Sequence, residues 1–352
     1  MAHEKRYYRS PHLLIEWGDG NCLHVVQLMS SRRYRLDLMI VTLLNYLSQP
    51  RTRTELAEAV PALADQLPDV LAKLESAGLL QTEAPSVQES LWSPYELAMH
   101  VQASTGSARK PLPPWPAPNA HKEVTFTRRL PLSSQPNTIS HRGKLSVAEA
   151  LGQRRSIRDY GEEPLTGEEL GVFLTTCARV FEFVGPQRYQ ATHRPSPSGG
   201  GRHSLELYVL CRNVAGLPPA VYYYDPFSNE LAELESWNSD HDGLLTRLIC
   251  GPAKLKRPPD VTFYVTSVIE RVFWKYQNSG LTLIYRDMGC LLQTMYLVAT
   301  DLGLAPCAIA AIDRPPLPSF VQGRALEEIH VGSFALARPA PSPDADRRLA
   351  EE

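Results

Sequence analysis

Three arginines and a serine stand close together in the segment "QRRSIRDY", residues 153–160. Guanidinium groups form forked, charge-assisted hydrogen bonds with phosphate, and each such bond is worth about 1.5–3 kcal/mol. We predict that this segment continues a helix, which places Arg154 and Arg158 on one face with the hydroxyl of Ser156 nearby. The pattern favours a phosphate site, and a solvated basic helix end is the alternative.

A run of three glycines lies in "PSPSGGGRH", residues 195–203, directly before an apolar strand. Glycine lets the backbone approach a flat ligand without a Cβ in the way, and it permits positive φ. Further along, Lys275 and Tyr276 are adjacent. An ammonium favours a neighbouring phenolate, and burial favours the free amine of a lysine, so this pair could act as general acid and base. The alternatives are a flexible surface loop and a snorkelling lysine beside a packed tyrosine.

The stretch from Gly289 to Ala299 is apolar nearly all round, which predicts a buried helix. Gln293 interrupts it and shares a face with Gly289. A buried amide without partners costs about 1–3 kcal/mol. We therefore expect Gln293 to bond either another helix or the heteroatoms of a ligand.

The elements that must position these residues lie in a main domain, which we place at residues 145–340. Helical patterns at 145–160 and 166–181 come first. Strand patterns follow at 205–210, 220–225 and 260–268, and a long helical pattern at 281–303 comes before a last strand. Such a mixture predicts an α+β sandwich.

Residues 1–85 form a second unit in this interpretation. Strand-like "LLIEW" and "CLHVVQL" surround a "GDGN" turn, and three short helices follow, the second with a capping box at Thr52 and Glu55. This order is typical of a winged helix. Residues 86–144 are proline-dense and predict an extended connector, or an arm wrapped on a partner subunit, with a short helix within "SPYELAMHVQAS". We expect a disordered tail over residues 341–352.

The totals exclude several classes of function. The chain has 352 residues, 43% of them hydrophobic, and a net charge of −2, so neither nucleic acid nor an anionic membrane is an expected partner. No apolar run approaches the roughly 20 residues of a membrane span. The six cysteines are scattered without a CxxC pair, which argues against a disulfide framework or a metal site. With no apolar signal region at the N-terminus, we expect a cytoplasmic protein.

Taken together, "RRSIR", "PSGGGRH", "KY" and "YRDMGCLLQTMYLVATDLGL" resemble the flavin-dependent nitroreductase superfamily over roughly residues 145–340. The resemblance is to the SagB-type branch, the azoline dehydrogenases of thiazole- and oxazole-containing peptide natural products. It implies a nitroreductase-like FMN-binding sandwich that forms an obligate homodimer. It also implies that Lys275 and Tyr276 are catalytic. The cofactor-binding residues implied are Arg154, Arg155, Ser156, Arg158, Pro197, Ser198, Gly199, Gly200 and Gln293.

The chemistry implied is the oxidation of a thiazoline or oxazoline ring. Tyr276 or Lys275 would remove the proton from the ring Cα, a hydride would pass to flavin N5, and oxygen would reoxidise the flavin. The unit at 1–85 resembles the winged-helix recognition domains that bind a leader peptide, so peptide substrate, homodimer partner and a cyclase partner enzyme are expected.

Two other functions stay open at this point. The same fold could act on a free or carrier-bound amino-acid-derived intermediate, and binding of a leader peptide by the N-terminal unit would argue for the peptide instead. A flavin-free scaffold that only binds peptide is the alternative from another class of protein. Such a scaffold would bind the leader peptide and show no yellow flavin colour.

Overall fold

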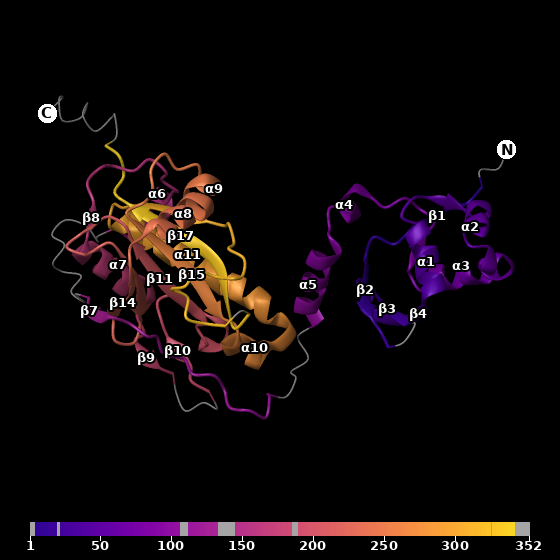
Figure 1. Ribbon diagram of the computed structural model, residues 1–352, viewed down its shortest axis with the longest axis horizontal. Coiled ribbons are helices and arrows are strands. Elements are labelled where there is room, and N and C mark those ends of the chain that lie inside the picture. Colours follow the sequence, from indigo (N-terminus) through magenta and orange to yellow (C-terminus); the bar gives the residue numbers. More distant parts are fainter. Residues whose placement is uncertain are drawn as a thin grey trace. The chain divides into compact units, whose positions relative to one another are not determined.

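The computed structural model describes residues 4–19, 22–105, 112–132, 145–184, 189–324 and 326–341. Contacts between residues divide the chain into two compact units, Met1–Arg109 and Lys110–Glu352 (Figure 1). Each unit has its own apolar core, and we describe them separately. The expected tail at 341–352 lies outside the described residues except for Pro341.

Two small antiparallel sheets form the first unit. The sheet β2-β3-β4 contains β2 (Leu13–Trp17), β3 (Cys22–Gln27) and β4 (Arg32–Asp37). In the other sheet, β1 (Arg6–Arg9) lies between β5 (Arg51–Thr52) and β6 (Leu80–Gln81). The strands expected at "LLIEW" and "CLHVVQL" are confirmed.

Helices complete the core of the first unit. The three expected helices are α1 (Leu38–Tyr46), α2 (Arg53–Ala59) and α3 (Leu67–Ser76), with a 3₁₀ turn η1 (Pro61–Gln66) between the last two. The capping box of Thr52 and Glu55 is present and begins α2. Two further helices, α4 (Val87–Ser90) and α5 (Pro94–Thr105), follow in the segment that the sequence predicts as a connector, and α5 is the short helix expected there. The winged-helix arrangement of this unit stays a prediction.

A seven-stranded sheet organises the second unit, with the order β16-β17-β15-β11-β13-β14-β7 and antiparallel neighbours throughout (Figure 1). The strands are β7 (Arg128–Pro131), β11 (Leu205–Cys211), β13 (Ala220–Asp225), β14 (Glu230–Ser236), β15 (Val261–Val268), β16 (Ala305–Ile309) and β17 (Glu328–Ala337). Short pairs flank it: β8 (Leu165–Thr166) with β12 (Val214–Ala215), and β9 (Glu182–Phe183) with β10 (Thr192–His193).

Apolar side chains project from both faces of this sheet, so each face packs against its own core. Along β11, Leu207 and Val209 enter one core, whereas Tyr208 and Leu210 enter the other. The first core is covered by α7 (Gly167–Ala178) and α11 (Gly280–Asp301). The second is covered by α8 (Ser239–Leu244) and the π-helix η4 (Leu245–Cys250), with α9 (Gly251–Ala253) following. This mixed α/β sandwich agrees with the predicted fold class.

The proline-rich segment from 112 to 127, which we call the strap, packs on the second unit of its own chain. The carbonyl oxygens of Trp115, Pro118 and Asn119 accept hydrogen bonds from buried side chains of that unit. Lys122 forms a buried ion pair with Glu328, and its ammonium also contacts the hydroxyl of Tyr208. Within the described residues, the strap therefore acts as part of the main unit.

Two expectations about helices are wrong. The helix α6 (Val147–Gln153) ends before the arginines, because Arg154 adopts ψ 124° and the amide of Ile157 donates a hydrogen bond to the carbonyl of Pro306 in β16. Arg154 and Arg158 therefore do not share a helical face. The helix α11 is buried on one face only, and Gln293 and Gly289 lie exposed on the other.

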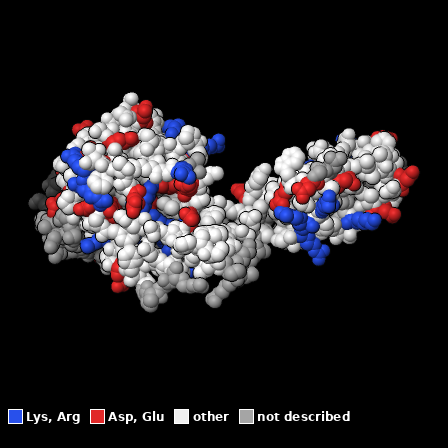
Figure 2. Space-filling view, turned by 60° about the horizontal axis from the view of Figure 1, so that its bottom comes forward, with Lys and Arg blue, Asp and Glu red and all other residues white. Residues whose placement is uncertain are grey.

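None of the helices in the described part of the chain is long and apolar enough to cross a bilayer. On the face of the larger unit drawn in Figure 2, basic and acidic side chains are interspersed and do not form a broad field of one sign.

Candidate active site

Residues 195–203, which we call the glycine loop, need their glycines for two reasons. Gly200 and Gly201 have φ of 63° and 66°, a left-handed backbone conformation that costs folding free energy for residues with a Cβ. The second reason is space, because a Cβ on Gly200 would lie 2.6 Å from both the Nζ of Lys275 and the hydroxyl of Tyr276. The glycine run and the Lys-Tyr pair, more than 70 positions apart in sequence, therefore meet in the fold.

Asp287 of α11 fixes the start of this loop. Its carboxylate accepts hydrogen bonds from the Ser198 hydroxyl at 2.6 Å and from the Gly199 amide at 3.0 Å. The Ser198 hydroxyl in turn accepts from the amide of His203 at 3.0 Å. Burial raises the pKa of Asp287, and the two hydrogen bonds to the carboxylate oppose this rise. The Gly199 amide is thus engaged within the chain, which differs from the expectation that it faces a ligand.

Lys275 and Tyr276 lie at the C-terminal end of α10 (Glu270–Tyr276), where Gln277 turns the chain away with φ 44°. The 3₁₀ turn η5 (Gln277–Ser279) then leads into α11. Both side chains are half-buried and point toward the exposed Gly200. The ammonium of Lys275 donates its hydrogen bond to the hydroxyl of Tyr189, not to that of Tyr276. Tyr189 is therefore a member of this cluster that the sequence analysis missed.

Residues 154–158, which we call the arginine loop, attach to a different part of α11. The hydroxyl groups of Ser156 and Tyr296 are 2.6 Å apart, and the guanidinium of Arg154 lies 5.2 Å from the centre of the Tyr296 ring. Within the described residues, no carboxylate lies within ion-pair distance of Arg154, Arg155 or Arg158. Arg155 and Arg158 are exposed. This set of unpaired cations suits an anionic group.

The helix α11 connects the two loops. Asp287 holds the glycine loop and Tyr296 contacts the arginine loop, nine residues further along. At a rise of 1.5 Å per residue and 3.6 residues per turn, these two anchor points are about 13.5 Å apart along the axis and on opposite sides of the helix. The arginine loop suits the anionic end of a ligand and the glycine loop suits a flat end, and within one chain the two loops flank opposite sides of α11. Gln293, exposed between these points, could contact such a ligand only on the outer face of α11.

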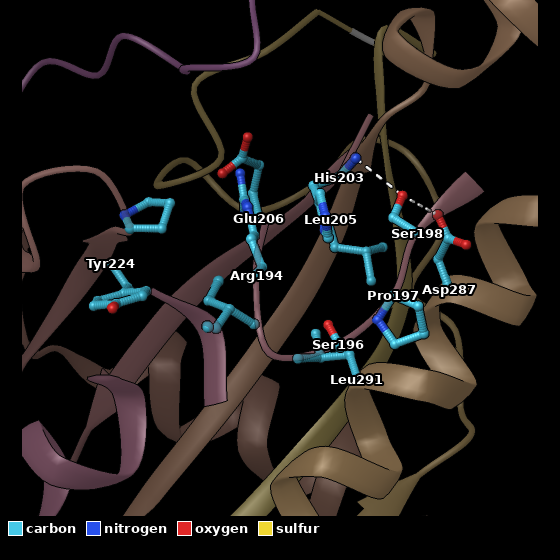
Figure 3. A pocket seen from close by; sticks show the side chains of 13 residues that line it. Arg194, Ser196, Pro197, Ser198, His203, Leu205, Glu206, Tyr224, Asp287 and Leu291 are labelled. Atoms are coloured by element: carbon cyan, nitrogen blue, oxygen red, sulfur yellow. Dashed lines mark hydrogen bonds between the residues drawn. The ribbon is translucent and has the colours of Figure 1, made fainter. Parts of the chain in front are cut away.

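A small cavity with a mostly apolar wall and a few polar groups lies beside Ser198 of the glycine loop (Figure 3). Arg194, Ser198, His203, Glu206 and Asp287 contribute to its wall. Its volume of about 30 Å³ is room for one or two water molecules, so a flavin ring cannot enter it. Glu206 forms a buried ion pair with Arg271, and burial lowers the pKa of His203 to about 3. The 3₁₀ turn η3 (Gly199–Gly201) does not line this cavity and Gly200 is exposed, so a ring ligand at Gly200 would lie outside the cavity.

The structure thus brings together the predicted Ser198, Gly199, Gly200, Lys275 and Tyr276. Pro197 belongs to the same loop and lines the cavity, whereas Arg154, Arg155, Ser156 and Arg158 form a separate group along α11. Besides Tyr189, the sequence analysis missed Asp287. Its signal was available in "YRDMG", because a lone carboxylate on the apolar face of a helix needs a buried partner.

The sequence profile of the nitroreductase family matches residues 151–329, just over half of the chain. The chain belongs to the nitroreductase family, whose members are flavin-dependent oxidoreductases.

Among its relatives is MJ1384 of Methanocaldococcus jannaschii, provisionally named a nitroreductase, which is 27% identical over 48% of this chain and 80% of its own length. Another is the microcin B17-processing protein McbC of Escherichia coli, 28% identical over 32% of this chain. The match spans only 43% of McbC. A solved structure from Anabaena variabilis, also provisionally named a nitroreductase, shares the fold with a TM-score of 0.51 at 20% identity, covering 68% of this chain and 45% of that one.

Proposed function

We propose that this protein is an FMN-dependent dehydrogenase that oxidises thiazoline or oxazoline rings in a peptide to thiazole or oxazole. The observation that carries the proposal is the meeting of Lys275 and Tyr276 at Gly200. Two groups able to hold a proton lie there beside the exposed backbone of Gly200, onto which a flat ring can be laid. The similarity to a protein named for microcin processing supports a peptide as substrate.

The residues present fit FMN. Arg154, Arg155 and Arg158 offer a phosphate several guanidinium donors that no carboxylate of the described residues pairs. The exposed backbone of Gly200 in the glycine loop offers a flat ring a surface to lie on, beside Lys275 and Tyr276. FMN, when bound, would supply a hydride acceptor.

The residues of this chain then handle the proton. Tyr276 as phenolate or Lys275 as free amine takes the proton from the ring Cα, and a hydride leaves the adjacent ring carbon, so the azoline loses two hydrogens and becomes aromatic. Such a step requires the base and the substrate ring to be held within contact distance. Asp287 supports this positioning, because its carboxylate accepts hydrogen bonds from Ser198 and Gly199, the two residues before Gly200.

The first unit would bind the leader part of the peptide. Among the described residues, β4 pairs with β3 alone and leaves one edge without a strand neighbour. An extended peptide can add to such an edge through backbone hydrogen bonds. A homodimer and a cyclase partner enzyme belong to the same proposal.

The test uses the purified full chain, a synthetic peptide with one thiazoline ring, and mass spectrometry to detect the loss of two hydrogens. We expect flavin absorption, FMN among the heat-released cofactors, and conversion of the peptide. Lys275→Ala should keep the bound FMN and lose most turnover, while Lys256→Ala, at a side chain 84% exposed, should change neither.

Three outcomes would count against the proposal. A colourless protein that also fails to take up added FMN would exclude a flavin enzyme. A flavoprotein that leaves the thiazoline peptide unchanged but oxidises a carrier-bound thiazoline would move the function to that substrate. Full turnover in Lys275→Ala would remove this lysine from the mechanism.

A further inference from the structure

We propose that Tyr189 is a positioning residue for Lys275, an inference that rests on the proposed function. The ammonium of Lys275 donates a hydrogen bond to the Tyr189 hydroxyl. It lies 4.4 Å from the centre of the Tyr189 ring, compared with 5.3 Å from that of Tyr276. The phenol that orients the lysine is therefore not its neighbour in sequence.

The ring of Tyr189 is itself held in place. The guanidinium of Arg202 lies 5.2 Å from its centre, and the indole of Trp274 meets it edge-on at 6.0 Å. Arg202 is fully buried, and its guanidinium donates to the carbonyl of Pro118 at 2.8 Å and to that of Arg271 at 3.0 Å. A buried guanidinium with several acceptors is fixed, and so is the ring that packs on it.

The strap supplies the outer part of this frame. The Trp274 indole nitrogen donates to the carbonyl of Trp115 at 3.1 Å, and the Arg271 guanidinium donates to that of Asn119 at 2.8 Å. The side-chain oxygen of Gln190, next to Tyr189, accepts from the amide of Ala120 at 2.8 Å. Both α10, which carries Lys275, and the residue that follows Tyr189 are thus tied to one segment.

A lysine needs such a partner, because its four-carbon chain has many rotamers and little to hold it at an exposed backbone. With the Tyr189 bond in place, the ammonium stays beside Gly200, on the side where a substrate ring would lie. Without that bond the amine samples other rotamers, and fewer molecules have it in the productive position. The chemical step should then slow while peptide binding stays the same.

The test variant is Tyr189→Phe in the full chain, which removes the hydroxyl and keeps the ring that packs on Trp274 and Arg202. Tyr95→Phe, at a tyrosine 77% exposed, is the matched control. With the thiazoline peptide we expect kcat to fall by about tenfold to a hundredfold with KM and FMN content unchanged. A raised KM with unchanged kcat would overturn the proposal, because Tyr189 would then act on the substrate.

A second readout does not depend on turnover. An amine-reactive acetylating reagent is added to each variant, and peptide mass spectrometry compares labelling of Lys275 with that of the exposed Lys256. In Tyr189→Phe this ratio should rise about fivefold, the effect of losing one hydrogen bond. An unchanged ratio would overturn the proposal. If even the wild-type protein oxidises no azoline peptide, the proposed function fails, and the labelling ratio still decides whether Tyr189 holds Lys275.

Discussion

Substituting Gly200 by alanine should abolish most turnover while leaving the protein folded. The perturbation is a single methyl group that points toward the side chains of Lys275 and Tyr276. In the structure that methyl carbon would lie 2.6 Å from the Lys275 amine and 2.6 Å from the Tyr276 hydroxyl. Both atoms are the far ends of side chains, so they can move away at a small cost in stability. Their movement displaces the two groups that the proposed mechanism uses.

The expected magnitudes separate stability from activity. Alanine at φ 63° costs about 1–2 kcal/mol of folding stability, because its Cβ crowds the backbone there. A shift of about 1 Å in a reacting group can cost about a hundredfold in rate. Gly216→Ala provides the matched control, since Gly216 has φ 86° and a Cβ there would meet nothing within 4 Å. Both variants should lose similar stability, and only Gly200→Ala should lose turnover.

The assay measures denaturant unfolding for stability and conversion of the thiazoline peptide for activity, with FMN content determined for each variant. Equal turnover in the two variants would refute the reasoning, because the contact of Gly200 with Lys275 and Tyr276 would then have no role in the reaction.

Two further predictions concern the cofactor and the pH dependence of stability. Arg155→Ala and Arg158→Ala should each weaken FMN binding by about tenfold to a hundredfold, because each variant loses one charge-assisted hydrogen bond. A fluorescence titration measures the affinity, with the exposed Arg324→Ala as control. Unchanged affinity in both variants would remove the arginine loop from the cofactor site. Burial lowers the pKa of His330 to about 4, below the value of about 6.5 in the unfolded chain. The unfolded chain therefore binds the proton first, and the folded state loses about 3 kcal/mol of stability as the pH falls from 6.5 toward 4. Unfolding measured across this range should show a shallower acid decline in His330→Asn than in the wild-type protein, and an equal slope would contradict the assignment.

Local sequence determined most of the elements. The capping box of Thr52 and Glu55 begins α2 because both of its hydrogen bonds form within four residues. The strands β11, β13 and β15 could be identified because a strand buried on both faces is a nearly continuous run of apolar residues. The glycines of the glycine loop were also a usable signal, since positive φ at Gly200 and Gly201 is a local requirement.

Other features depended on contacts that local patterns do not contain. The helix α6 ends before the arginine loop because a hydrogen bond to Pro306, 149 positions from Ile157, holds the chain out of the helix. The apolar composition around Gln293 predicted burial all round the helix, and the exposure of this face of α11 in the single chain could not be predicted from it. Asp287 could have been suspected from its helix, but its partner loop could not.

The sequence by itself determined the family, the order of the strands and helices along the chain, and the residue types that the site contains. Only the tertiary structure decided which of those residues meet. Lys275 and Tyr276 are neighbours in sequence, yet the hydrogen bond of the lysine goes to Tyr189, 86 positions away, because Arg202, Trp274 and the strap hold that ring against it. Packing of distant segments fixes the direction in which a flexible side chain points, and no spacing along the chain contains that information.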